Sequence, residues 1–356
     1  MLKMISELNI LYITKLRDSK ANGVTVAVSQ LLNSISKYTN VAWLDIGDIS
    51  IDSCNNVLKL SLNDWEKFDV DIAVFEDPFN DLRFCKLARI LEKKRIPYIL
   101  SPHGCFTKVA MKNKALKKYI SIHTVFRHFL SNCYATQYLC VNERNNSIRF
   151  NEEIVIPNGI LINNDIQIRK DIKNIVFIGR KDVRHKGIDF LLKAILIEKE
   201  VLQYKNVKVS IYGSTESEKD DTYINNFIIE NNLSDIVFNY GQIFGEEKKT
   251  VLKKSDLFIL TSRHEGFPMS ILEALSYGLP VLITEGTNMT DIIEKANAGW
   301  TCATDEKAIS KKIENAVNCT DCSVLSRNAI KLANQYSWDS VSQETISKYN
   351  KIIEKS

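Results

Sequence analysis

Residues 256–286 have the sequence "DLFILTSRHEGFPMSILEALSYGLPVLITEG", in which two apolar runs flank a longer amphipathic segment. The first and last seven residues have the length and the β-branched content of buried strands. Pro268 suits the first position of a helix, where its missing N–H would be unpaired anyway, and Gly278 suits the position where a helix stops. The segment therefore predicts a strand, a helix between Pro268 and Gly278, and a second strand parallel to the first.

The same alternation extends along the chain in two series. Strand-like runs lie at 8–16, 41–46, 71–77 and 97–104, and again at 174–180, 207–214, 235–241, 256–262 and 280–286. Amphipathic segments between the runs predict helices, so each series predicts parallel βαβ units. We expect an α/β protein with two Rossmann-like, doubly wound parallel sheets. The N-terminal domain would cover 1–165 and the C-terminal domain 166–336, with a final helix over 337–356 that packs back on the N-terminal domain.

The composition is that of an ordinary folded protein. The chain has 356 residues, 45% of them hydrophobic, and a formal net charge of +4, too small to indicate nucleic-acid binding. Eight cysteines are scattered without a disulfide framework, which favours a reducing cytoplasm. No apolar run reaches the roughly 18 residues that span a bilayer, and the N-terminus lacks an export signal. We therefore expect a cytoplasmic protein.

Two glutamates, Glu265 and Glu273, flank the start of the helix expected after Pro268, with seven residues between them. The free N–H groups of a helix start form an anion site, and Gly266 lets a ligand approach the backbone. A single glutamate here would usually be a solvated loop or helix residue. The pair around a Gly-x-Pro turn instead indicates a cradle for a phosphate with polyols on both sides, as in a sugar nucleotide.

A second motif adds positive charge at the same strand ends. Arg180 follows a strand-like run, and Lys186 precedes Gly187 at the start of the next expected helix. A guanidinium makes paired hydrogen bonds to phosphate oxygens, and an ammonium adds a compact charge. Lys181 and Arg184, which lie between these residues, are interpreted as solvated.

Together these motifs resemble the retaining glycosyltransferases of family 4, which have the GT-B fold. The resemblance rests on "EGFPMSILE" at 265–273 with its continuation "ALSYGLPVLIT", on "FIGRKDVRHKGIDFLLKAI", "IPNGI" and "LSPHG", and on the closing "YSWDSVSQETISKY". It implies two Rossmann-like domains facing across a cleft, with the acceptor on the first and a nucleotide sugar on the second. It is strong over roughly 100–340 and weaker before that.

The resemblance also implies roles for individual residues. Glu273 would hold the ribose, Glu265 would hold the sugar, and Arg180 with Lys186 would stabilise the leaving diphosphate. His103, in "SPHG", would lie near the sugar and the reacting phosphate. The remaining substrate contacts would come from Gly266, Phe267, Pro268 and Met269, from Gly213 at a strand end, and from Asn22 and Gly23, where the usual Gly-Gly pair of the family is missing.

The expected reaction is retaining transfer of a hexose or N-acetylhexosamine from a UDP- or GDP-linked sugar to a glycan. The resemblance favours an undecaprenyl-diphosphate-linked acceptor in O-antigen, capsule or exopolysaccharide synthesis, on the inner face of the cytoplasmic membrane. A nucleotide-sugar epimerase or a phosphorylase on the same fold is an alternative. A non-catalytic glycan- or nucleotide-binding subunit is an alternative of another class.

Three further features concern metal binding and membrane contact. Asp69-Val70-Asp71 lies at the start of an expected strand, the wrong end for a metal site, and Cys319-x-x-Cys322 lacks further zinc ligands. We therefore expect neither a metal nor another cofactor. The basic, amphipathic stretch 106–130 fits either contact with an anionic membrane or a solvated helix face packed on the sheet.

Overall fold

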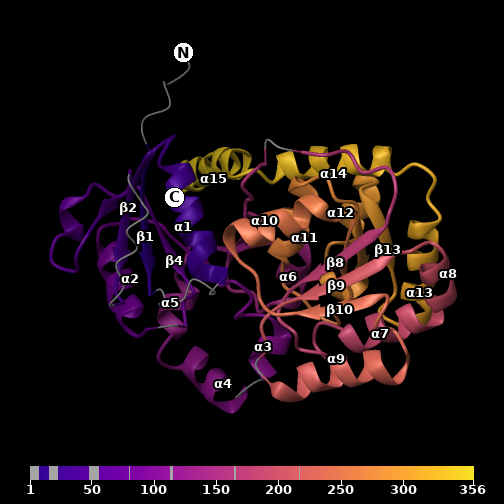
Figure 1. The fold of residues 1–356 in the computed structure, drawn as a ribbon. Coiled ribbons are helices and arrows are strands. Elements are labelled where there is room, and N and C mark those ends of the chain that lie inside the picture. Colours follow the sequence, from indigo (N-terminus) through magenta and orange to yellow (C-terminus); the bar gives the residue numbers. More distant parts are fainter. Residues whose placement is uncertain are drawn as a thin grey trace. The chain divides into compact units, whose positions relative to one another are not determined.

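The computed structural model describes residues 8–15, 23–47, 56–79, 81–112, 115–163, 166–215 and 217–356. The chain divides into two compact units. Unit 1 consists of the chain up to Gly159 together with Trp338–Ser356, and unit 2 consists of Ile160–Ser337. Each unit is built on one parallel sheet with helices packed around it (Figure 1). The prediction of two Rossmann-like α/β sheets is therefore confirmed.

Unit 1 contains a seven-stranded sheet with the order β3-β2-β1-β4-β5-β6-β7. All its neighbouring strands are parallel, and the order reverses between β1 and β4. Its strands are β1 (Asn9–Thr14), β2 (Asn40–Asp45), β3 (Leu58–Lys59), β4 (Ile72–Glu76), β5 (Tyr98–Ser101), β6 (Ala135–Tyr138) and β7 (Glu152–Val155). Its α-helices are α1 (Gly23–Ile35), α2 (Arg83–Lys93), α3 (Lys108–Lys112), α4 (Ala115–His123), α5 (Arg127–Ser131), α6 (Val141–Asn146) and α15 (Trp338–Ile353), and the short helix η1 covers Trp65–Lys67.

Helix α15 belongs to unit 1, although it follows unit 2 in the sequence. Its buried residues Val341 and Tyr349 pack in the same apolar cluster as α1 and one face of the sheet. At its start, the Trp338 indole lies against Gly159, where a Cβ would come within 2.5 Å of the ring, and its N–H donates to Gln30 at 2.8 Å. The C-terminal helix thus completes the core of the first sheet.

Unit 2 contains a six-stranded parallel sheet with the order β10-β9-β8-β11-β12-β13, which repeats the order of the first six strands of unit 1. Its strands are β8 (Asn174–Ile178), β9 (Lys208–Tyr212), β10 (Val237–Tyr240), β11 (Leu257–Leu260), β12 (Val281–Thr284) and β13 (Gly299–Cys302). Its helices are α7 (Ile188–Ile197), α8 (Lys199–Tyr204), α9 (Glu218–Glu230), α10 (Gly245–Lys254), α11 (Met269–Ser276), η2 (Glu285–Thr287), α12 (Thr290–Ala296), α13 (Glu306–Val317) and α14 (Ser323–Gln335).

The segment 256–286 forms the strand, helix and parallel strand that its pattern predicts. Strands β11 and β12 are fully buried neighbours, and α11 connects them. Helix α11 begins at Met269, one residue after Pro268, which is the N-cap. It ends as expected, because Gly278 takes a left-handed conformation with φ 73°. The described helices include none that is long and apolar enough to cross a membrane.

Candidate functional site

In a doubly wound sheet, ligands bind beyond the carboxyl ends of the strands, where the strand order reverses. In unit 2 this point lies between β8 and β11. The loops that follow these two strands, 179–187 and 261–268, are joined by hydrogen bonds. The Thr261 hydroxyl donates to the carbonyl oxygens of Lys186 and Gly187 at 3.2 and 3.0 Å, and the Arg263 N–H donates to the His185 carbonyl at 2.9 Å. The sequence motifs around Arg180 and Glu265 thus meet at one place.

Gly187 allows this close approach of the two loops. Its φ is 63°, a left-handed conformation, and a Cβ at this position would lie 2.0 Å from the Thr261 carbonyl oxygen. Only glycine fits both the conformation and the space. Helix α7 therefore begins directly against the end of β11.

Lys186 and Glu265 form an ion pair at this junction. The Lys186 Nζ lies 2.5 Å from the Glu265 Oε1, and the Ser262 hydroxyl donates to the same oxygen at 2.5 Å. The two charged side chains are only 15% and 10% exposed, so their attraction is less screened than that of a surface pair. The structure thus brings together two residues that the sequence proposes as catalytic.

The Glu265 backbone, like its side chain, is hydrogen-bonded to neighbouring residues. Its N–H donates to the Gly286 carbonyl at 2.8 Å, and the Asn288 side-chain amide donates to the Glu265 carbonyl. These bonds anchor the loop to the segment after β12. They fix Glu265 at the carboxyl ends of the strands.

Arg263 is a residue of this junction that the sequence patterns do not reveal. Its guanidinium binds the Asp189 carboxylate through two bonds of 2.7 Å and donates to the Arg184 carbonyl at 2.5 Å. The guanidinium also lies 3.7 Å from the centroid of the Phe190 ring. Arg263 thereby ties the loop before Glu265 to the first turn of α7. No spacing rule relates positions 189 and 263, which meet only in the folded sheet.

Glu273 lies in the second turn of α11, and its carboxylate pairs with the Lys248 ammonium of α10. At the start of the same helix, Phe267 is buried, and its ring centroid lies 5.9 Å from that of Tyr336. A Cβ on Gly266 would meet nothing within 4 Å, so there is space beside this backbone. The N-terminus of α11, at Met269, adds partial positive charge beside that space.

Arg180 and Lys181, which follow β8, differ in exposure. Arg180 is exposed, whereas the Lys181 side chain is only 3% exposed. The interpretation of Lys181 as a solvated residue is therefore wrong, because its ammonium is enclosed by acceptors within unit 2. Arg184 is exposed, as expected for a solvated residue.

The remaining predicted substrate contacts are Gly213, Gly23 and Asn22. A Cβ on Gly213 would lie 1.8 Å from the Gly179 carbonyl oxygen, so close packing after β8 and β9 already requires a glycine there. Gly23 is the first residue of α1 in unit 1. Asn22 lies outside the described residues.

His103 of unit 1 follows β5 in an unusual backbone conformation. Its φ is 46°, which is uncommon for a residue other than glycine, and Gly104 follows with φ 86°. The His103 Nε2 lies 2.5 Å from the Glu76 Oε2 and 3.3 Å from the Ser101 hydroxyl. Burial favours the neutral ring, but the charge and hydrogen bond of Glu76, together with the charges of Glu143 and Asp77, outweigh it and raise the pKa of His103 above its ordinary value of 6.5.

A second buried carboxylate holds the same turn. The Glu143 Oε1 accepts from the Gly104 N–H at 2.6 Å, and its Oε2 accepts from the Leu139 N–H at 2.7 Å. Burial raises the pKa of Glu143, and these two bonds oppose that effect. Glu76 and Glu143 are 2% and 3% exposed. The sequence patterns do not single out either residue, because nothing local marks an acid as buried.

The Asp69-x-Asp71 motif precedes the amino end of β4, whereas His103 follows the carboxyl end of the neighbouring parallel strand β5. Asp71 directly precedes β4 and accepts from the Asn9 backbone N–H at 2.8 Å. Within the part of the chain that the structure describes, no three or more His, Cys, Asp or Glu side chains group as metal ligands would.

Residues 161–333 match the family model of glycosyl transferases group 1. One relative, an uncharacterized glycosyltransferase of Methanocaldococcus jannaschii, is 25% identical over 292 residues, which cover 80% of this chain and 76% of the relative. A second glycosyltransferase of that organism is 26% identical over 192 residues, 53% of this chain and 47% of the relative, so the chain spans about half the length of that protein. The N,N'-diacetylbacillosaminyl-diphospho-undecaprenol alpha-1,3-N-acetylgalactosaminyltransferase of Campylobacter jejuni is 28% identical over 244 residues, 63% of this chain and 62% of the relative.

Solved structures share the fold at low sequence identity. Sucrose-phosphate synthase from Thermosynechococcus elongatus superposes with a TM-score of 0.71 at 15% identity, covering 98% of this chain and 100% of the other. Anabaena HepE in complex with UDP superposes with a TM-score of 0.72 at 14% identity, covering 97% and 100%. Residues 161–333 are thus similar to a glycosyl transferases group 1 domain, and the chain has a GT-B-type fold.

Proposed function

We propose that this chain is a glycosyltransferase that moves a hexose or N-acetylhexosamine from a UDP- or GDP-linked sugar to a glycan hydroxyl with retention of anomeric configuration. The observation that carries the proposal is the Lys186–Glu265 ion pair at the point where the strand order of unit 2 reverses. A cation for phosphate and an acceptor for sugar hydroxyls lie side by side there, next to the start of α11.

The pair suggests how a donor would bind. An ammonium has three N–H donors, and the described contacts of Lys186 use one of them, on Glu265. A donor diphosphate would draw Lys186 to its oxygens, with Arg180 and the N-terminus of α11 adding positive charge. The Glu265 carboxylate would then accept hydrogen bonds from sugar hydroxyls, and Glu273 would accept those of the ribose. The sugar would contact Gly266, Phe267, Pro268 and Met269, and the nucleoside would contact Gly213.

The reaction needs no covalent bond to the protein. The bond from the anomeric carbon to the diphosphate oxygen breaks as the acceptor oxygen bonds the same face of the sugar, and the acceptor proton passes to the leaving diphosphate. Lys186 and Arg180 would stabilise the charge that develops on that diphosphate. The Glu265 carboxylate serves as a hydrogen-bond acceptor, since Lys186 and Ser262 already bind it. His103, Asn22 and Gly23 would make further contacts with the substrates.

The acceptor would be a glycan on undecaprenyl diphosphate, in the synthesis of a surface polysaccharide. The name of the Campylobacter relative includes such an acceptor. Helix α4 leaves Leu116, Tyr119 and Ile120 exposed by 74%, 61% and 51%. Residues 106–130 contain lysines and arginine but no acidic residue. We therefore assign α4 to the anionic inner face of the cytoplasmic membrane, where such an acceptor resides.

A donor screen tests this function. The purified chain is incubated with UDP- and GDP-linked sugars, with and without a diphospho-lipid-linked glycan, and the products are identified by mass spectrometry. We expect glycosylated lipid only when donor and acceptor are both present. Conversion of the donor alone to another nucleotide sugar would indicate the epimerase, and dependence on inorganic phosphate the phosphorylase. Nucleotide binding without turnover under all conditions would indicate a non-catalytic subunit.

A further inference from the structure

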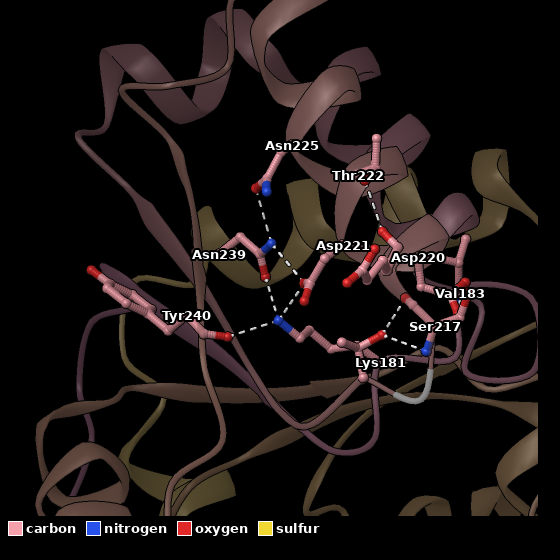
Figure 2. Close-up of polar contacts among 11 residues, drawn as sticks. Lys181, Val183, Ser217, Asp220, Asp221, Thr222, Asn225, Asn239 and Tyr240 are labelled. Carbon is pink, nitrogen blue, oxygen red and sulfur yellow. Dashed lines mark hydrogen bonds and ion pairs between the residues drawn. The ribbon is translucent and has the colours of Figure 1, made fainter.

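Lys181 places a buried positive charge next to the proposed phosphate-binding residue Arg180. Its Nζ donates to the Asp221 Oδ1 at 2.5 Å, the Asn239 Oδ1 at 3.1 Å and the Tyr240 carbonyl at 2.9 Å (Figure 2). An ammonium has three N–H donors, so these three acceptors use all of them. Lys181 therefore has no donor left for a phosphate, unlike Lys186 at the other end of the loop.

The acceptors around Lys181 are themselves held in place. The Asn239 amide nitrogen donates to the Asp221 Oδ1 at 3.1 Å and to the Asn225 Oδ1 at 3.0 Å, which links the end of β10 to helix α9 (Figure 2). The carboxylate of the neighbouring Asp220 accepts from the Val183 backbone N–H at 3.3 Å. The first turn of α9 thus binds both Lys181 and the loop that follows it.

The backbone of the loop is fixed by the same strand ends. The Lys181 N–H donates to the Ser214 carbonyl at 2.7 Å, and the Gly179 N–H donates to the Tyr212 carbonyl at 3.0 Å. The Lys181 side chain reaches β10, where its Nζ donates to Asn239 and Tyr240. A buried charge is strongly unfavourable unless its hydrogen-bond partners are placed correctly, so the buried Lys181 ammonium restricts the loop to few conformations.

We propose that Lys181 is a positioning residue, which fixes loop 179–187 so that Arg180 and Lys186 present their charges to the donor diphosphate. This inference rests on the proposed function for the identity of the ligand. It differs from a purely structural role, because losing Lys181 should weaken binding of the second phosphate specifically. Binding of a nucleoside monophosphate, which depends less on this loop, should change little.

The test compares affinities of purified variants for a nucleoside diphosphate and the matching monophosphate, by calorimetry below the unfolding temperature. UDP and UMP are used first, then GDP and GMP. For K181M we expect roughly tenfold weaker diphosphate binding, with monophosphate binding within about twofold of the wild type. D221N removes the charge of a partner that is 32% exposed, and it should lower the ratio of diphosphate affinity to monophosphate affinity by about threefold. This variant remains informative if K181M does not fold.

The matched control is K199M. Lys199 also donates to a carbonyl within unit 2, that of Asn231 at 3.1 Å, but it lies at the start of α8. K199M should keep the wild-type affinity ratio. Variants K181M and D221N that unfold at lower temperature but keep the wild-type ratio would overturn the proposal. A wild-type chain that binds neither diphosphate would instead contradict the proposed function, and with it the role of Lys181.

Discussion

Lys186 and Glu265 are 79 residues apart in the sequence, yet the Lys186 Nζ lies 2.5 Å from the Glu265 Oε1. The contact exists because β8 and β11 are neighbours at the reversal of strand order, and because Gly187 lets α7 start against the end of β11. Each residue would be an ordinary surface charge alone. In the proposed function, Lys186 would meet the donor phosphates and Glu265 would accept hydrogen bonds from the sugar hydroxyls.

The first prediction concerns the charge of Lys186. K186M should lower the rate of glycosyl transfer by about 100-fold or more, because a preorganised cation for the leaving diphosphate is lost. Initial rates at saturating donor measure the effect. K193M, at an exposed lysine of α7, the helix that follows Lys186, serves as control and should keep wild-type activity. Equal rates for K186M and K193M would exclude Lys186 from the reaction.

The second prediction concerns Gly187. An alanine there would adopt a strained φ of 63° and place its Cβ 2.0 Å from a carbonyl oxygen. G187A should therefore reduce the free energy of unfolding by about 3 kcal/mol or more, measured by urea denaturation. G245A separates the two effects, because Gly245 has φ 53° but nothing within 4 Å of its Cβ. G245A should reduce the free energy of unfolding by about 1 kcal/mol, which is the backbone strain alone. Equal losses of stability in G187A and G245A would contradict the packing argument.

The third prediction concerns the pH dependence that His103 contributes. The pKa of His103 is raised in the folded state, so the Glu76 interaction stabilises the fold fully below about pH 6.5 and is lost as the pH rises through the folded pKa. E76Q should lower the pKa of His103, measured by NMR of the imidazole ring, and should weaken this pH dependence. Glu143 and Asp77 also raise this pKa and remain in the variant, so the shift should be partial.

The exposed pair of His128 and Glu92 provides the control for that experiment. Their side chains are 50% and 26% exposed, and surface pairs contribute little to stability. E92Q should leave the pH dependence of unfolding as in the wild type. An imidazole titration of His103 that is the same in E76Q and in the wild type would contradict the assigned cause.

The fourth prediction concerns Trp338, through which the C-terminal helix completes unit 1. The indole is 4% exposed, so W338A should destabilise unit 1 by about 3–5 kcal/mol. Hydrogen exchange should show loss of protection in α1 and α15, while β8 to β13 keep theirs. L116A, at a residue that is 74% exposed, should change neither. Equal loss of protection in both units would show that Trp338 does not act through unit 1.

Much of the fold follows from the sequence because its strands are buried and apolar. The runs that become β1, β4, β8 and β11 are continuous hydrophobic segments, and Pro268 and Gly278 mark the ends of α11. The strand-like runs do not include β3, β6, β7 or β13. Strand β3 has only two residues, and β6 is buried, but its sequence "ATQY" is partly polar. The residues of β7 and β13 are not fully buried, and "EEIV" and "GWTC" carry little hydrophobic pattern.

The site was only partly predictable for a different reason. Glu265 and Lys186 lie in motifs whose local sequence indicates a helix start at a strand end. Lys181 and Arg263 lie in the same two loops, but no local feature marks them, and Glu76 lies near the end of a strand-like run. Each is defined by partners distant in the sequence. Composition alone places charged residues at the surface, so a buried, fully bonded charge is visible only in the folded chain.

The most direct test of the central claim is the rate and stereochemistry of transfer by the E265A variant. With the donor and acceptor identified by the screen, NMR of the first-formed linkage in the wild type should show the anomeric configuration of the donor. E265A should fold normally and lose about 100-fold or more in rate, while E246A, at an 86% exposed glutamate of α10, should match the wild type. An inverted linkage, or full activity in E265A, would contradict a retaining transferase built on the Lys186–Glu265 pair.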